Sequence, residues 1–234
     1  MLKLDRTSVP EPPCLKAFDY TIHTWDDFKN PCRRVVRLAL QRIQGQQLVT
    51  DDENDEAEYI LGLRCAYCES QIFFGGHIEH FRRKNEKHFP ELTFEWTNLF
   101  LACASTEHCG HYKDRPGALP YNPDELIKPD VDDPDKYLYF HSSGEVRVRN
   151  NQGLSPDELR RGSETIRVFN LRDSRLSGLR RAAVSSYISR NPNILESLME
   201  FSPEDRQEYI QMEIEATQWQ PFSTTIRHFL EKAL

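Results

Sequence analysis

Residues Cys65 to Lys113 read CAYCESQIFFGGHIEHFRRKNEKHFPELTFEWTNLFLACASTEHCGHYK, and this stretch decides the fold. Two pairs of cysteines frame it, and a Glu-His pair and a Trp-x-Asn-Leu segment lie between them. Thiolates that share one metal ion must come together in space. The stretch is therefore predicted to close around an ion, with the rest of the chain as its scaffold.

The spacing of these cysteines predicts a structural zinc site. Two residues separate Cys65 from Cys68, so both thiolates can reach one ion from a tight turn. Cys103 and Cys109 would complete a tetrahedral four-thiolate site, whose binding free energy contributes to folding. Five residues separate this second pair, more than the usual two, so His108 is an alternative fourth ligand. The competing interpretation is four unrelated buried thiols.

The composition and the N-terminus predict a cytoplasmic protein. The chain has 234 residues, of which 38% are hydrophobic and 29% charged, enough apolar material for a core. No stretch approaches the roughly 20 apolar residues of a membrane helix, and residues 1–14 lack the apolar region of a signal peptide. In a reducing compartment, paired cysteines indicate metal rather than disulfides. Cys14 and Cys32 are expected to be separate thiols, buried or half-buried.

The net charge of −7 argues against a protein that coats DNA through positive charge alone. Acidic residues concentrate at 51–58 and 124–135. The first run is interpreted as a solvated loop, with repulsion that steers nucleic acid as the alternative. A local basic cluster can still contact substrate, and it consists of Arg82, Arg83, Lys84 and Lys87. Because the net charge is negative and the basic cluster is small, the protein is expected to depend on a partner to hold its substrate.

Hydrophobic periodicity predicts an α+β protein with three regions, at residues 1–60, 61–150 and 151–234. Helices are expected at 31–44, 57–63, 155–168, 174–190, 203–218 and 222–234. A hairpin is expected from 137–141 and 145–149. The apolar face of the helix at 174–190 is predicted to consist of Leu176, Leu179, Ala183 and Tyr187. Arginines on the helices at 155–190 are interpreted as solvated, with nucleic acid or a partner as the alternative.

Residues 77–80 carry the candidate chemistry and read His-Ile-Glu-His. On a β-strand, His77 and Glu79 share one face and His80 points to the other. Phosphodiester hydrolysis needs a base to activate water and a cation to neutralise the phosphate. His80 can be the base, because an unperturbed imidazole titrates near about pH 6.5. Glu79 can be an oxygen ligand for Mg²⁺ or another divalent ion.

Three later residues extend this candidate site. Asn98 can orient the loop that follows His80 through its side-chain amide. His111 lies in the helix expected after Cys109 and can supply a second metal ligand. Lys113 can touch a substrate phosphate. The order Glu-His, Asn, His, framed by cysteine pairs, is much rarer by chance than any one of these residues.

Four segments together resemble the zinc-containing HNH endonucleases: Cys65-x-x-Cys68, Ile78-Glu79-His80-Phe81, Trp96-x-Asn98-Leu99 and Cys103…Cys109-x-x-x-Lys113. More closely, the series CAYCE, IEHF, WxNL and CGHYKD resembles the PtuB family, the HNH component of the bacterial Septu anti-phage system. That family also occurs beside retrons. The resemblance covers most of residues 1–190 and extends to LDRTSVPEPPCL near the start and to LIKPD and DPDKYLYF.

The resemblance implies a ββα-metal core stapled by Zn²⁺ and flanked by N-terminal and C-terminal helices. It implies nucleic-acid cleavage, with DNA as the default substrate, in a hetero-oligomer with PtuA, an ATPase of the ABC or OLD type. His80 would be the base, Glu79 and His111 would flank one divalent ion, Mg²⁺ or Mn²⁺, and Asn98 would brace the site. From their charge, the side chains expected to bind substrate are Arg82, Arg83, Lys84 and Lys113.

One departure from the family pattern affects the metal site. In many zinc-type HNH sequences the third motif residue directly follows the last cysteine, but here Gly110 has that place and His111 comes next. One helical residue is about 100° of rotation. The longer loop before Cys109 can shift the start of the helix and so restore the position of His111. Otherwise, the assignment of His111 as a metal ligand is less secure than the assignment of His80 as the base. His77 is a further candidate for the site.

Three other functions compete with DNA cleavage. RNA, including tRNA, is an alternative substrate, because no residue here reads base or sugar identity. A base deaminase would use His77-x-Glu79, but Ala102 stands where its Pro-Cys-x-x-Cys motif needs proline. A zinc-ribbon module that only binds a partner would leave the Glu-His pair unused.

Overall fold

The computed structural model describes residues 1–48, 59–72, 76–150 and 153–232. The helices are α1 Cys32–Gln44, α2 Cys109–Lys113, α3 Pro134–Tyr137, α4 Pro156–Val168, α5 Ser174–Arg190, α6 Ile194–Glu200, α7 Pro203–Thr217 and α8 Ser223–Glu231. The strands are β1 Gln46–Leu48, β2 Tyr59–Leu61, β3 His77–His80, β4 Leu99–Ala102, β5 Leu138–Phe140 and β6 Val146–Val148. They pair as the antiparallel hairpins β1–β2, β3–β4 and β5–β6. This mixture confirms the predicted α+β class, while the division at residues 60 and 150 stays a prediction.

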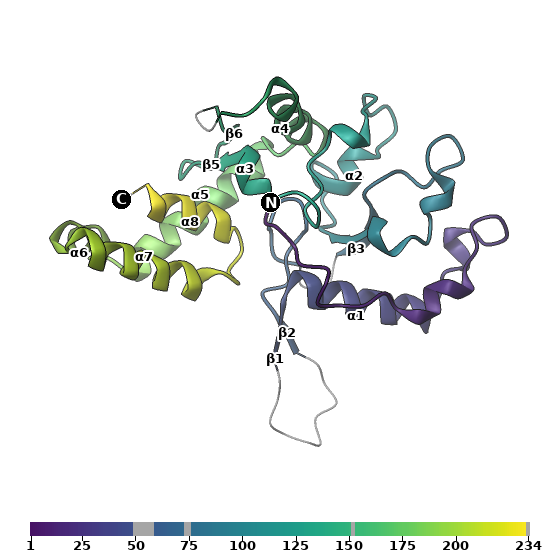
Figure 1. Cartoon of the computed structure of the whole chain (residues 1–234), viewed down its shortest axis with the longest axis horizontal. Helices are drawn as coiled ribbons and strands as arrows, with labels where there is room; N and C mark the ends of the chain where they lie inside the picture. Colours follow the sequence, from purple (N-terminus) through teal and green to yellow (C-terminus); the bar gives the residue numbers. More distant parts are fainter. Residues whose placement is uncertain (49–58, 73–75, 151–152, 233–234) are drawn as a thin grey trace, which may run out of the picture.

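The centre of the molecule is the β3–β4 pair, which α2 follows along the chain (Figure 1). His80 pairs with Leu99 in the register, and His77 pairs with Ala102. All four residues of β4 are buried, as expected for an apolar strand inside a core. Two 3-10 helices, Pro90–Leu92 and Trp96–Asn98, shape the loop that joins the strands.

Helix α1 packs one apolar face on β4, as its periodicity predicts: Val36, Leu40 and Ile43 are buried. The side chain of Gln44 then joins helix to strand. Its Oε1 accepts from the Leu101 amide at 2.7 Å, and its Nε2 donates to the Leu101 carbonyl at 2.8 Å. Helix α1 is therefore held in a fixed orientation against the central pair.

The helix predicted at 57–63 is wrong where the structure describes it. Tyr59–Leu61 is a strand that pairs antiparallel with Gln46–Leu48. An aromatic and a β-branched residue side by side favour an extended chain once a partner strand is present. Residues 57 and 58, and the acidic run 51–58, lie outside the described residues.

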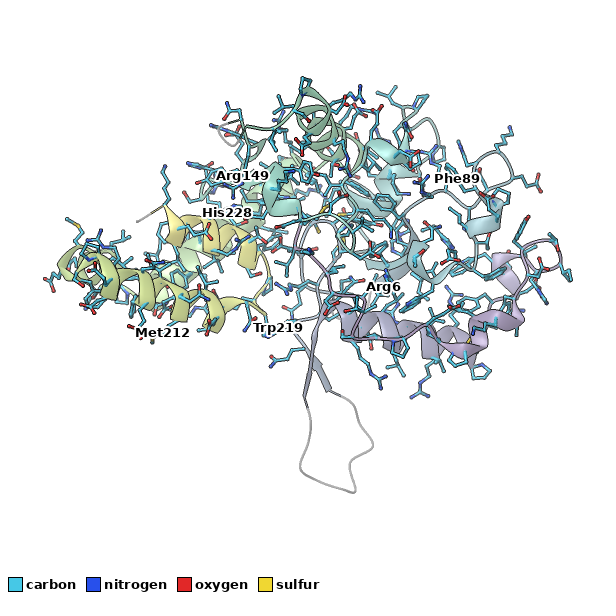
Figure 2. The ribbon with its side chains drawn as sticks, viewed as in Figure 1. Arg6, Phe89, Arg149, Met212, Trp219 and His228 are labelled. Atoms are coloured by element: carbon cyan, nitrogen blue, oxygen red, sulfur yellow. A yellow bond between two sulfur atoms is a disulfide. The ribbon has the colours of Figure 1, made fainter. Side chains whose placement is uncertain are left out.

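The C-terminal region contains the hairpin and helices that the sequence predicts, and also α6, which it does not. In Figure 1, α5, α6, α7 and α8 lie together on the side away from α1. A second apolar cluster holds them, separate from the main core: Val184, Tyr187, Ile194, Leu198, Ile210, Ile226 and Leu230. Helix α8 is tied to the β5–β6 hairpin, where Arg149 lies 3.0 Å from the His228 ring (Figure 2). None of the described helices combines the length and hydrophobicity needed to cross a bilayer.

The buried face predicted for α5 is wrong at one position. Leu179 is 50% exposed, whereas Arg180 next to it is fully buried. The Arg180 guanidinium donates to the Leu171 carbonyl at 2.7 Å and lies over the Phe140 ring. An arginine can replace an apolar residue in a core when its charged end finds acceptors and its stem packs.

Cys14 and Cys32 are not the separate thiols expected from the sequence. They form a disulfide that joins the 3-10 helix Pro13–Ala17 to the first residue of α1. Their Cα atoms lie 5.7 Å apart, because the N-terminal segment folds back on α1. The chain between them forms a closed loop that includes Trp25.

This pairing predicts the number of reactive thiols. After chelation and denaturation without a reductant, four thiols are expected to react, and all six should react after reduction. The difference arises because a disulfide does not react with thiol reagents, whereas metal-bound cysteines are freed by the chelator. Titration with a chromogenic disulfide, checked by mass spectrometry of alkylated peptides, measures both values. Six reactive thiols in the unreduced protein would contradict the Cys14–Cys32 bond.

Candidate functional site

The four cysteines framing the central stretch converge on one point. Their sulfur atoms all lie within 4.8 Å of one another. The Cys65–Cys109 sulfurs are 3.7 Å apart and the Cys68–Cys103 sulfurs 3.9 Å. A tetrahedral ion with Zn–S bonds of about 2.3 Å places its ligands about 3.8 Å apart. The cluster can therefore hold a zinc ion.

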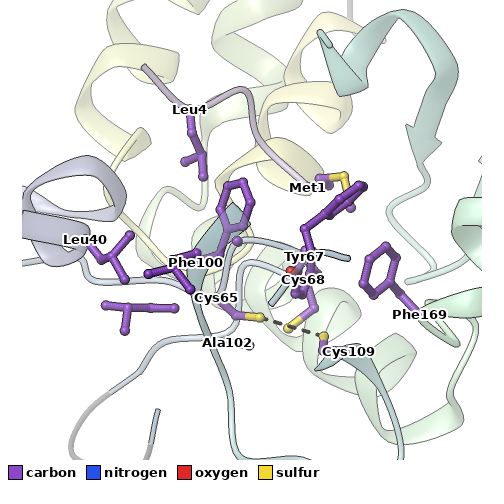
Figure 3. Packing of buried hydrophobic residues seen from close by; sticks show 14 of the residues in the cluster. Met1, Leu4, Leu40, Cys65, Tyr67, Cys68, Phe100, Ala102, Cys109 and Phe169 are labelled. Atoms are coloured by element: carbon purple, nitrogen blue, oxygen red, sulfur yellow. Dashed lines mark hydrogen bonds between the residues drawn. The ribbon is translucent and has the colours of Figure 1, made fainter. Parts of the chain in front are cut away.

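The local backbone explains how this cluster forms. The turn Cys65–Cys68 is closed by the Glu69 amide, which donates to the Cys65 carbonyl at 3.1 Å. Cys103 directly follows β4, and Cys109 is the first residue of α2. Figure 3 shows the sulfurs of Cys65, Cys68 and Cys109 pointing toward one another beneath buried aromatic rings. An ion bound here would join the end of β4 to the start of α2.

His108 lies against the cluster without completing it. Its Nδ1 is 3.2 Å from the Cys109 sulfur and 3.8 Å from that of Cys103. Cys109 belongs to the convergent group, so the long second spacing still brings a cysteine to the fourth position. His77 is not in this group, which argues against the deaminase arrangement.

The second group of polar residues surrounds Glu79 on β3. The Glu79 carboxylate is buried and has two partners: His77 Nε2 lies 3.0 Å from Oε2, and Lys113 Nζ lies 3.0 Å from Oε1. The Lys113 contact is an ion pair whose angles do not make a hydrogen bond, so Oε1 keeps unused accepting capacity. Burial alone raises the pKa of Glu79, but the Lys113 charge and His77 outweigh it and lower the pKa to about 2.

Lys113 lies inside the protein, whereas it was expected from the sequence to contact a substrate phosphate. Its side chain is fully buried, and Nζ donates to the His80 carbonyl at 3.0 Å and to Asp114 at 2.7 Å. Glu79 raises the pKa of Lys113 against the opposing effect of burial. An ammonium enclosed in this way stabilises the Glu79 carboxylate and does not fit direct contact with a phosphate.

His80 is oriented by the protein on two sides. Its Nε2 is 2.9 Å from the Thr93 carbonyl, and a carbonyl only accepts, so Nε2 carries the hydrogen. Nδ1 then keeps a lone pair. The Trp25 ring packs nearly perpendicular to the imidazole, with centroids 4.4 Å apart. Burial, and secondarily the charge of Lys84, lowers the pKa of His80 to about 4, so the ring is neutral at pH 7.

Asn98 braces the loop that follows His80, as its predicted role requires. Its Oδ1 accepts from the Arg82 amide at 2.8 Å, and its Nδ2 donates to the carbonyls of Arg82 and Leu92, both at 3.0 Å. The side chain is buried, and these bonds use most of its capacity. Asn98 therefore fixes the start of the β3–β4 loop.

Gly110 directly follows the last cysteine, where many zinc-type HNH sequences have the third motif residue, and the structure shows why a glycine stands there. A Cβ atom on Gly110 would lie 2.4 Å from both Cδ and Oε2 of Glu79, so the helix backbone and the carboxylate touch at this glycine. His111 is the next residue and stacks on His77, with centroids 3.9 Å apart. Its ring therefore reaches the Glu79 region. The His77 Nδ1 atom is buried without a hydrogen-bond partner.

A cleft of about 900 Å³ opens above these groups and is lined by Glu79, His80, His77 and His111. Of the predicted basic residues, Arg83 and Lys84 line it, whereas Arg82 turns to Asp124 and the Phe89 ring. Trp25, Arg33 and Arg115 are among the lining residues that sequence reasoning missed. No short motif marks them, because they come from the N-terminal segment, α1 and the loop after α2.

Replacing Gly110 by alanine is expected to displace the Glu79 carboxylate. The new methyl group cannot fit at 2.4 Å, so the free energy of unfolding should fall by about 1–3 kcal/mol while zinc content is kept. Denaturant unfolding and zinc analysis measure both. Gly178→Ala is the matched control, because a Cβ there meets no atom within 4 Å, and alanine should stabilise α5 by about 1 kcal/mol. Equal stability of Gly110→Ala and the wild type would contradict this packing.

Comparisons with known proteins leave the site to be interpreted from its own geometry. No protein-family model matches the chain, and no curated protein matches it either. The resemblance to HNH endonucleases therefore depends on the motif residues alone, and a function has to be inferred from their arrangement.

Proposed function

We propose that this chain is a metal-dependent HNH endonuclease that hydrolyses phosphodiester bonds, with DNA as the default substrate. The observation that carries the proposal is the His80 ring, which is neutral, fixed through Nε2 by the Thr93 carbonyl, and at the wall of a cleft beside ionised Glu79. A general base needs an oriented lone pair, and Nδ1 supplies it.

The proposed reaction divides the work among residues of two strands and a helix. His80 Nδ1 takes the proton from the attacking water as the water oxygen bonds to phosphorus. The bond from phosphorus to the leaving oxygen breaks, and that oxygen takes a proton from solvent. Glu79 and His111 would hold a divalent ion, Mg²⁺ or Mn²⁺, which neutralises charge on the phosphate. Lys113 keeps Glu79 ionised, and Asn98 keeps the His80 loop in place. A zinc ion held by the four cysteines would fix α2 relative to β4 and have a structural role.

The charge balance supports a partner. With a net charge of −7, the isolated chain should have little nonspecific affinity for nucleic acid. We therefore propose that it acts in a hetero-oligomer with an ATPase of the ABC or OLD type, as the nuclease of an anti-phage defence complex. The PtuB resemblance suggests this partner.

A cleavage assay tests the proposed function. Plasmid DNA, single-stranded DNA and total RNA are incubated with the chain, with Mg²⁺ or Mn²⁺, with and without an ATPase of the ABC or OLD type. His80→Ala should lose cleavage, and His88→Ala should keep it, because His88 is exposed on the same loop and outside the cleft. Cleavage of RNA but not of DNA would identify RNA as the substrate. No cleavage by zinc-loaded protein in any combination would favour a binding module.

The pH profile of cleavage follows from the low pKa of His80. Because burial keeps the imidazole neutral above about pH 4, the single-turnover rate should not change with His80 ionisation between pH 6 and 8. An imidazole with a pKa of about 6.5 would instead give a roughly fourfold rise over this range. The rate is measured at constant ionic strength and saturating metal. An inflection near pH 6.5 that depends on His80 would contradict the buried neutral base.

A further inference from the structure

The Trp25 indole belongs to the cleft and is held rigidly on one face. Its centroid lies 4.8 Å from that of Phe28 and 6.0 Å from that of Phe94, with interplanar angles of 32° and 29°. The two phenylalanine centroids are themselves only 6.0 Å apart, so the two rings and the indole form one packed cluster. A ring fixed in this way loses little conformational entropy when a ligand packs on it.

Part of the Trp25 ring is open to the cleft, next to His80 and Lys84. The ring is half-buried and lines the cleft, and Lys84 Nζ lies over it, 5.7 Å from the centroid. A lysine over an aromatic face is easily displaced, since its long stem has several rotatable bonds. Arg33 and Arg115 line the same cleft and supply further positive charge.

We infer that Trp25 is a stacking platform for one unpaired base next to the phosphate that is cleaved. This inference rests on the proposed nuclease function. The indole contacts His80 and lines the cleft, so a base stacked on its exposed part would lie beside the phosphate that His80 serves. Lys84, displaced from the ring, would then pair with a backbone phosphate. Every base has an aromatic face, so the contact favours no particular base.

The inference names the class of substrate. A base inside a duplex is stacked on both faces and cannot also cover a protein ring. The substrate is therefore a nucleic acid with at least one unpaired nucleotide at the cleavage site, either a single strand or a loop or bulge. Fully paired duplex should be cut poorly unless a base is extruded.

The test uses fluorescent oligonucleotides that are single-stranded, fully paired, or single-stranded with one abasic position near the cut. Removing a base–aromatic stack typically weakens binding about 5- to 150-fold. Trp25→Ala should raise KM for the single strand by this factor, with a smaller effect on kcat, and Trp25→Phe should recover most of it. Tyr20→Ala is the matched control, because Tyr20 is an exposed aromatic residue of the same disulfide-closed loop outside the cleft.

The abasic series separates stacking from a purely structural role. At one position, loss of the base should weaken binding to wild type but have no added effect in Trp25→Ala. The stacking platform is wrong if removal of the base and Trp25→Ala weaken binding additively at every abasic position. It is also wrong if Trp25→Ala weakens binding of single strand and duplex equally.

Binding measured by fluorescence anisotropy in the His80→Ala background separates this inference from the nuclease proposal. If unpaired strands bind in a Trp25-dependent manner but the wild type does not cleave them, the nuclease proposal is wrong and the stacking platform is supported. If cleavage depends on His80 but Trp25→Ala has no effect, the nuclease proposal is supported and the stacking platform is wrong. No binding to any oligonucleotide, either by the chain alone or by its complex with the ATPase, would overturn the platform as well.

Discussion

Replacing His80 by alanine is expected to lower the rate constant for nucleic-acid cleavage by about 10²–10⁴-fold, the usual contribution of a positioned general base. The reason is geometric. Nε2 is committed to the Thr93 carbonyl, so Nδ1 is the nitrogen left to accept a proton. In the described part of the cleft wall, no second neutral imidazole has its ring fixed in this manner by a backbone carbonyl.

The loss must be distinguished from unfolding, because His80 is buried and packs on Trp25. His80→Ala should therefore be compared with wild type for zinc content and thermal unfolding before kinetics are measured. His88→Ala controls for loss of an imidazole from the same loop. A His80→Ala protein that folds, holds zinc and cleaves at the wild-type rate would exclude His80 as the base.

Replacing Cys65 by serine should abolish the folded state. Structural zinc sites contribute about 10–16 kcal/mol in zinc-finger peptides, and whole domains are stable by only about 5–15 kcal/mol. The expected result is loss of bound zinc, seen by native mass spectrometry, together with loss of the cooperative unfolding transition. Chelation of the wild-type protein should reproduce both effects.

Cys14→Ser is the matched control for this experiment. It removes a cysteine outside the cluster and opens the disulfide, which should cost about 3 kcal/mol for a loop of this length while zinc stays bound. A Cys65→Ser protein that keeps one equivalent of zinc and wild-type stability would mean that the cluster is four unrelated thiols after all.

Features that depend on local patterns of residues could be predicted before the fold was known. Helix α1 follows from its apolar periodicity, and α4 follows from the Ser155–Glu158 capping box, whose hydrogen bonds are present. The strand His77–His80 and the short helix after Cys109 were also predictable, as was the convergence of the four cysteines. The helices and the strand depend on patterns within a few residues, and the cysteine cluster was predictable because each pair has a short spacing of its own.

Tertiary structure alone decided the contacts between distant segments. Nothing near Lys113 indicates that its ammonium is buried against Glu79, and nothing near Trp25 indicates that its ring packs on His80. The Cys14–Cys32 bond likewise depends on the N-terminal segment folding back on α1. These outcomes depend on which surfaces meet when the core forms, and local propensity carries no information about that. The metal ligands could therefore be predicted from spacing, whereas the surroundings that set the pKa of Glu79 and His80 required the fold.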